Sequence, residues 1–129
     1  MTQEERSFLR KALQSLEGAA SEFSNRRYDN CANRSYYACF QAAIYALQEA
    51  GITARSGLWG HDYVPAQFEG QLINRRHRFG TELRGVLENV RALRWRADYY
   101  EDTVSRTEAE RALRRTQRFV NSIQGGEPQ

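Results

Sequence analysis

The segment Phe79–Tyr100 reads FGTELRGVLENVRALRWRADYY. Its apolar side chains recur at four-three-four-three-four spacing, which places them on one side of an α-helix; they are Phe79, Leu83, Val86, Val90, Leu93 and Ala97. Arg94 and Asp98 fall one turn apart at the edge of this stripe, whereas Trp95 and Tyr99 point away from it. We therefore predict a helix over 79–100 around which the rest of the chain is organised, with a second face that needs a partner.

The length of 129 residues is enough for one domain with a single core, without help from metals or disulfides. No apolar run approaches the length that crosses a bilayer, and the N-terminal MTQEERSFLRK is charged and unlike a signal peptide. We therefore expect a cytoplasmic protein without membrane contact. We predict one helical bundle over 1–124 and a disordered tail over 125–129.

Cys31 and Cys39 lie eight residues apart on one predicted helix. A rise of 1.5 Å per residue separates them by about 12 Å along the helix axis, which is too far for a disulfide. Both are therefore expected to be reduced and buried. Because no further cluster of Cys or His is present, the sequence indicates no metal site, and it indicates no cofactor.

Capping boxes mark the starts of the first and last helices. The first box is Thr2–Glu5, and apolar residues at helical spacing follow it through Phe23. The second is Ser105–Glu108, and its apolar series continues to Ile123.

The second helix is expected over 31–50, with a cap at Asp29 or Asn30 and a stop at Gly51. The connection that follows is irregular except for a short helix around Val64–Ile73. These patterns predict an all-α protein. Its architecture is an antiparallel four-helix bundle with an extra short helix in the connection between helices two and three.

The outer side of helix 31–50 carries aromatic and polar residues at three-four-four-three spacing: Arg34, Tyr37, Gln41, Tyr45 and Gln48. Aromatic residues interleaved with Arg and Gln favour an interface or the wall of a cleft. Alternatively, Tyr37 and Tyr45 cover neighbouring helices and leave their hydroxyls in water. Both interpretations remain open at this point.

Arginine supplies eighteen of the nineteen basic residues, and seven arginines stand against two acids from Arg75 to Arg96. Arginine forms bidentate contacts with phosphate and carboxylate, so the local excess indicates nucleic acid or an acidic partner. Coding bias in a GC-rich genome is the alternative for the overall composition, and a solvated loop is the alternative for the run 74–78. The candidate nucleic-acid-binding residues are Arg34, Arg75, Arg76, Arg78 and Arg96.

His61 lies close to Trp59 and Tyr63 in the irregular connection. A single histidine among aromatic residues is more often a packing residue than a catalyst. It is nevertheless a side chain that exchanges a proton near neutral pH. Both roles remain open for His61.

Together these features resemble the HEPN domain family of helical bundles, in particular its small prokaryotic members marked by Arg-x-x-Ala-Asp-Tyr. That pattern stands here at Arg94–Tyr99, which reads RWRADY. The resemblance extends to NRSYYACFQAA at Asn33–Ala43, to His61 followed by Phe68, and to the start of the last helix at Val104–Ser105. It covers nearly the whole chain.

The resemblance implies a bundle of four to five helices and three kinds of function. Many HEPN proteins are dimeric, metal-independent ribonucleases with an Arg-x4–6-His motif paired across the dimer. Others are toxins neutralised by a nucleotidyltransferase antitoxin, and others are inactive nucleic-acid-binding or assembly modules in defence systems. This sequence departs from the ribonuclease pattern, because no His follows Arg94.

Three residues are the catalytic candidates if this chain cleaves RNA: Arg94, Asp98 and His61. His77 is a further histidine that could reach the site in space, and Arg94 and Arg34 could act mainly as phosphate clamps. Asp98 at its ordinary pKa is a poor acid. The alternative for Arg94 and Asp98 is an i,i+4 pair that holds helix three against helix two.

We expect a HEPN protein of a prokaryotic toxin–antitoxin or antiviral defence module that binds or cleaves RNA as a homodimer. The alternative is a non-catalytic module that docks a nucleotidyltransferase or a larger nucleic-acid effector. A bundle that binds a small phosphorylated ligand ranks last, because the sequence has no Gly-rich phosphate loop. Both leading hypotheses expect self-association through Tyr37, Tyr45, Trp95 and Tyr99.

Overall fold

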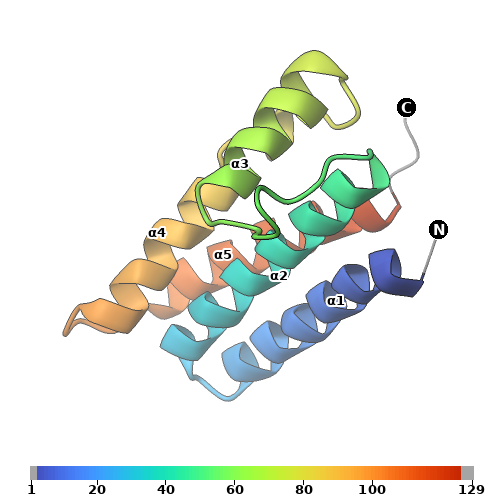
Figure 1. Cartoon of the computed structure of the whole chain (residues 1–129). Helices are drawn as coiled ribbons and strands as arrows, with labels where there is room; N and C mark the ends of the chain where they lie inside the picture. The colour runs from blue at the N-terminus through green and yellow to red at the C-terminus, as the bar shows by residue number, and fades with distance from the viewer. Residues whose placement is uncertain (1–2, 126–129) are drawn as a thin grey trace.

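The structure is a computed structural model that describes residues 3–125. Its four long helices form a bundle in which successive long helices run in opposite directions (Figure 1). The predicted all-α class is confirmed, since no strand occurs within the described residues. The long helices are α1 (Gln3–Ser24), α2 (Tyr28–Glu49), α4 (Val86–Tyr99) and α5 (Arg106–Gln124). The connection between α2 and α4 contains α3 (Tyr63–Gln67), a π-helix (Phe68–Arg75) and a 3₁₀ turn (Thr81–Leu83).

Two predictions concern the ends of the chain. The first capping box includes Thr2 and the disordered tail includes 126–129, and these residues lie outside the described part. Gly125 follows the last turn of α5, where its N–H donates to the carbonyl of Asn121 at 2.8 Å. Helix α5, the last of the bundle, ends at Gln124.

Helix α2 lies at the centre of the bundle and contacts α1, α4 and α5. Thirteen of its 22 residues are buried, compared with three of the 14 residues of α4. Eight of the thirteen have small side chains: Cys31, Ala32, Ser35, Ala38, Cys39, Ala42, Ala43 and Ala46. Small side chains allow neighbouring helix axes to approach closely. The predicted central role of the helix over 79–100 is therefore wrong, because α2 organises the core.

Helix α4 begins at Val86, so the prediction of one helix over 79–100 is wrong before that residue. Gly85 has a φ of 81°, a left-handed conformation that glycine adopts without steric cost and that breaks the helix. The N–H of Gly85 donates to the Glu69 carboxylate at 2.9 Å. The apolar spacing continues through the break because Leu83, in the 3₁₀ turn, also reaches the core.

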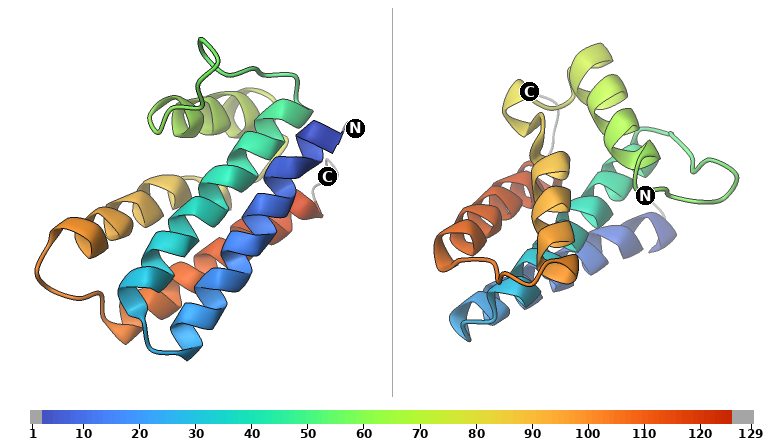
Figure 2. Two further views of the ribbon diagram at one scale, coloured as in Figure 1. Left: turned by 60° about the horizontal axis from the view of Figure 1, so that its bottom comes forward. Right: turned by 90° about the vertical axis from the view of Figure 1, so that its left-hand side faces the viewer.

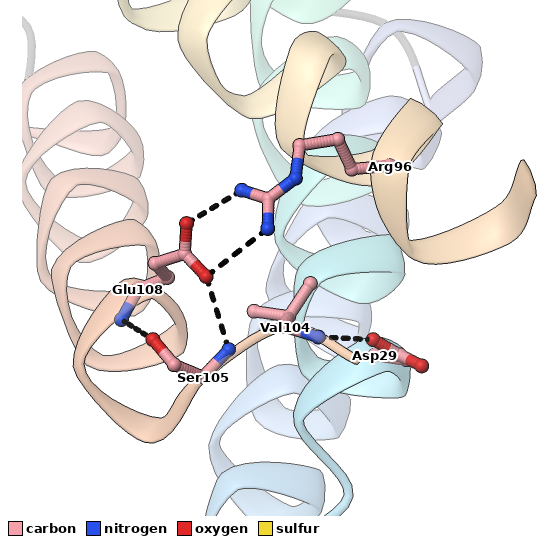
Figure 3. A network of polar contacts seen from close by, with 5 residues as sticks. All are labelled: Asp29, Arg96, Val104, Ser105 and Glu108. Atoms are coloured by element: carbon pink, nitrogen blue, oxygen red, sulfur yellow. Dashed lines mark hydrogen bonds and ion pairs between the residues drawn. The ribbon is translucent and has the colours of Figure 1, made fainter. Parts of the chain in front are cut away.

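Helix α2 begins at Tyr28, so Asp29 and Asn30 lie in its first turn and not at the predicted cap. The Asp29 carboxylate instead accepts the N–H of Val104 at 2.8 Å (Figure 3). This bond ties the first turn of α2 to the loop before α5. The predicted stop at Gly51 is confirmed, since this residue follows the last turn with a φ of 82°.

The short helix predicted around Val64–Ile73 is confirmed as α3 and the π-helix. Figure 2 shows this segment beside the C-terminal half of α2. Phe68 anchors it, since its side chain is fully buried and its ring centre lies 5.5 Å from that of Phe79 and 5.1 Å from that of Phe119 on α5. These three rings join the connection to the last helix.

Both cysteines are free and buried. The thiol of Cys31 lies 3.9 Å from the carbonyl of Ala109, and that of Cys39 lies 3.5 Å from the Thr116 hydroxyl. Burial raises the pKa of Cys31 to about 11 and that of Cys39 to about 12. The two residues therefore stay protonated at neutral pH and act as small packing residues between α2 and α5.

Within residues 3–125, no helix is both long and apolar enough to cross a membrane. Among the side chains that the structure describes, those of residues 6–125, there is no group of three or more His, Cys, Asp or Glu arranged to bind a metal ion.

A polar network closes the loop between α4 and α5 (Figure 3). The predicted capping box is confirmed: the Ser105 hydroxyl accepts the Glu108 N–H at 3.1 Å, and the Glu108 carboxylate accepts the Ser105 N–H at 3.0 Å. Arg96 on α4 pairs with the same carboxylate at 2.5 Å. The hydrogen bond from Arg96 and the capping contacts lower the pKa of Glu108 to about 2.

We expect Glu108→Ala to lower the free energy of unfolding by about 1 kcal/mol, because it removes half of a capping box and an ion pair. The folded pKa of about 2 lies below the ordinary 4.5, so this stabilisation is present above pH 4.5 and is lost as the pH falls toward 2. Urea unfolding in neutral and acidic solution measures both effects. Glu110→Ala, which removes only an exposed pair with Arg114, is the control, and an equal loss there would contradict the prediction.

Candidate functional site

An ion pair on α4 forms the first part of the site. The Nε atom of Arg94 lies 3.2 Å from a carboxylate oxygen of Asp98, as the i,i+4 spacing predicts, and the two side chains are only 21% and 30% exposed. The guanidinium carbon of Arg94 also lies 5.3 Å from the ring centre of Tyr36 and 5.4 Å from that of Tyr37. The faces of such rings attract cations. One carboxylate and two aromatic rings therefore hold Arg94 in place.

Helix α2 supplies a second arginine. Arg34 is exposed, and its guanidinium carbon lies 5.3 Å from the ring centre of Tyr37. Arg34 donates to the side-chain oxygen of Asn33 at 2.9 Å, and the Asn33 amide donates to Asp98 at 3.4 Å. A polar line therefore runs from Arg34 across the α2–α4 contact to Arg94. Arg34 uses one N–H group in this line, and a guanidinium has others with which to bind an anion.

His61 joins the site from the loop before α3. Its ring stacks on that of Phe40 of α2, with the centres 4.8 Å apart and the planes inclined by 19°. The Nδ1 atom of His61 is hydrogen-bonded to the hydroxyl of Tyr36. Arg91 of α4 donates to the His61 carbonyl at 3.2 Å and to the Asp62 carboxylate at 2.7 Å. These contacts fix the loop on both α2 and α4.

Tyr36 connects His61 to Arg94, because its hydroxyl contacts the first and its ring faces the second. Burial raises the pKa of Tyr36 to about 12, although Arg91 and Arg94 oppose this shift. Burial and the positive charges of the same two arginines lower the pKa of His61 from its ordinary 6.5, and Asp62 partly opposes them. At neutral pH, Tyr36 is therefore protonated and the imidazole of His61 is neutral.

Four of the arginines predicted to bind nucleic acid lie away from this cluster: Arg75, Arg76, Arg78 and Arg96. Near the end of α2, Arg76 donates to the carbonyl of Ala50 at 2.9 Å, and Arg78 pairs with Glu49 at 3.2 Å. Arg96 is held in the network that closes the α4–α5 loop. Of the predicted set, Arg34 is the member that the structure brings to Arg94.

The predicted interface residues fall into two groups. Tyr45 is only 7% exposed and belongs to this chain's own core, and its hydroxyl donates to Glu49 at 3.4 Å. A surface role predicted for Tyr45 is therefore wrong for this chain. Tyr37 is partly buried beneath the two arginines. Trp95 and Tyr99 point away from the core as predicted, since they are 55% and 63% exposed with ring centres 4.3 Å apart.

A comparison with protein-family models matches residues 5–125 to the HEPN domain. The chain belongs to the HEPN domain family. The match spans α2, α4 and every residue of the site described above, so the predicted resemblance to the HEPN family is confirmed. The assignment of Arg94–Tyr99 to the pattern of the small prokaryotic members stays a prediction. None of the curated proteins compared with the chain matches it.

Sequence patterns assign no role in the site to four of the members of this candidate site: Asn33, Tyr36, Asp62 and Arg91. Helical periodicity places Tyr36 in the core but does not predict which residue its hydroxyl contacts. Arg91 lies three residues before Arg94, so helix geometry alone could have placed both on one side of α4. No local signal connects Asp62 with Arg91, because the loop reaches α4 only in the folded chain.

We expect His61 to titrate below pH 6.5 and Arg91→Gln to raise its pKa, because the substitution removes a nearby positive charge and frees Asp62. NMR signals of the imidazole ring, followed through a pH titration, measure this shift. The control is Arg84→Gln, which removes an arginine bonded to Asn74 outside the site. An unchanged His61 pKa in Arg91→Gln, or an equal change in the control, would disprove the proposed coupling.

Proposed function

We propose that this HEPN-domain chain binds RNA at the α2–α4 site, as a homodimer within a prokaryotic toxin–antitoxin or antiviral defence module. The observation that carries the proposal is the convergence of Arg34 and Arg94 on the ring of Tyr37, at 5.3 and 5.4 Å. Two cations beside an aromatic ring suit a phosphate with its neighbouring base. Membership of the HEPN family supports the same function.

Arg34 and Arg94 have different roles in this proposal. Arg34 is exposed and has no carboxylate partner among the described side chains, those of residues 6–125, so it is available for a phosphate. Arg94 is already paired with Asp98 and largely covered, so it contributes a fixed positive charge. Asp98 orients Arg94 and Asn33 across the helix contact, which is a positioning role.

A second candidate function is RNA cleavage without a metal ion, and the position of His61 favours it. His61 contacts Tyr36, whose ring centre lies 5.3 Å from the guanidinium carbon of Arg94. The lowered pKa keeps the imidazole neutral, and therefore basic, at neutral pH. The required tautomer has Nδ1–H donating to the Tyr36 oxygen, which leaves the lone pair on Nε2.

The chemistry of this cleavage is a transesterification. Nε2 of His61 takes the proton of an RNA 2′-hydroxyl, and the 2′-oxygen attacks the adjacent phosphorus. The bond from phosphorus to the 5′-oxygen breaks, and that oxygen takes a proton from water. The imidazolium of His61 returns its proton to solvent, and a 2′,3′-cyclic phosphate remains. Arg94 stabilises the negative charge that develops on the phosphoryl oxygens.

The alternative is a non-catalytic module that docks a nucleotidyltransferase or a larger nucleic-acid effector. Its specific support is the exposure of Trp95, Tyr99 and Tyr100, which are 55%, 63% and 61% exposed at the end of α4. Exposed aromatic residues of this kind are frequent anchors of protein interfaces. In the homodimer, Trp95 and Tyr99 would anchor the second protomer instead.

Fluorescence anisotropy with a labelled single-stranded RNA at several salt concentrations tests the primary proposal. We expect Arg34→Gln to weaken binding and to reduce the slope of log K against log salt by about 0.7, which corresponds to one lost phosphate contact. The matched control is Arg10→Gln, which removes an exposed arginine from α1 and should leave both quantities unchanged. A wild-type chain that binds no RNA would refute the proposal.

Incubation of the same RNA with the chain in EDTA tests cleavage separately from binding. If His61 is the base, cleavage should increase as the pH rises through a value below 6.5 and then level off, because the basic form dominates above the lowered pKa. His61→Gln and Arg94→Ala should both abolish cleavage, while Arg10→Gln should not. RNA binding with no cleavage by the wild type would leave the binding function and exclude the nuclease.

A further inference from the structure

A separate cavity lies where the start of α4 meets the C-terminal half of α5, with a volume of about 280 Å³. The 3₁₀ turn contributes Glu82 and Leu83 to its wall, and α4 contributes Val86. Helix α5 contributes the remaining side chains. None of these residues belongs to the α2–α4 site, so the cavity is independent of the proposed RNA-binding surface.

The floor of the cavity is apolar. Leu83 and Val86 are only 4% and 7% exposed, and both belong to the main core. A ligand that enters the cavity can therefore bury an apolar group against them. Such a floor distinguishes the cavity from a purely charged surface.

The rim of the cavity carries unpaired positive charge. Arg115 and Arg118 lie three residues apart on α5, so their side chains share one side of the helix, and both are exposed. Neither has an acidic partner in the part of the chain that the structure describes, whereas six other arginines do: Arg27, Arg78, Arg91, Arg94, Arg96 and Arg114. The next turn of α5 adds Asn121 and Ser122, whose side chains also carry hydrogen-bond donors.

One acid, Glu82, also lines the cavity. Its carboxylate folds back against Gly80, where its oxygens occupy the space that a Cβ atom at Gly80 would need. Because the lining has two arginines, Arg115 and Arg118, and only this one acid, its net charge is positive.

We propose that this cavity binds a small organic oxyanion. Its phosphate or carboxylate group contacts Arg115 and Arg118, because the guanidinium fork matches the geometry of both groups. Its apolar body packs on Leu83 and Val86. The volume lies just below the range of about 300–1,000 Å³ found for larger ligands, so the body is about the size of one substituted ring.

Methyl NMR on the full chain tests this proposal, with the Leu83 and Val86 signals followed during titrations. The probes are phenyl phosphate, benzoate and the uncharged benzyl alcohol. We expect saturable shifts with at least one anion and about tenfold weaker binding of benzyl alcohol, since one charge-assisted hydrogen bond contributes about that factor. The anion that binds more tightly identifies the preferred head group.

The matched variants are Arg118→Gln and Arg111→Gln, because Arg111 is also exposed on α5 but does not line the cavity. Arg118→Gln should weaken anion binding about tenfold, and Arg111→Gln should leave it unchanged. Equal binding of the anions and benzyl alcohol, or equal effects of the two substitutions, would overturn the proposal. Displacement of phenyl phosphate by single-stranded RNA would also overturn it, because the arginines would then belong to a nucleic-acid surface.

Discussion

Helix α2 is covered on three sides by α1, α4 and α5, and this close approach is possible only where its side chains are small. Alanine, cysteine and serine occupy most of its buried positions, including both free thiols. A larger residue at such a position would push a neighbouring helix outward, since a packed core does not absorb extra volume without strain. The small residues of α2 therefore set the distances between the helices on which the site depends.

Tyr36 is a large residue among these small ones, and it joins the buried core to two side chains of the site. It is only 1% exposed, yet its ring faces Arg94 and its hydroxyl contacts His61. Phe40, one turn further along α2, supports the His61 ring. The packing of α2 against α4 and against the loop before α3 therefore determines the positions of the candidate catalytic groups. They do not depend on local chain conformation alone.

The arginines of this chain fall into two groups, those that pair with an acid and those that do not. Several are held by acids and fasten one segment to another, as Arg96 fastens α4 to the cap of α5 and Arg91 fastens the His61 loop to α4. Exposed ion pairs of this kind contribute little stability individually, and their main effect here is on geometry. Others have no acidic partner among the described residues, including Arg34 in the α2–α4 site and Arg115 and Arg118 at the cavity, and the two binding proposals rest on these three.

The sequence alone determined the features that arise within a few turns of one helix. These are the helical segments of the bundle, the cap at Ser105, the stop at Gly51, the Arg94–Asp98 pair and the outward direction of Trp95. Periodicity and capping reveal them because their interactions join residues only three or four positions apart. The tertiary structure alone decided the break at Gly85, the central place of α2 and the assembly of Arg34, His61 and Arg94. These features depend on contacts between distant residues, such as Asn33 with Asp98, and only the folded chain brings such residues together.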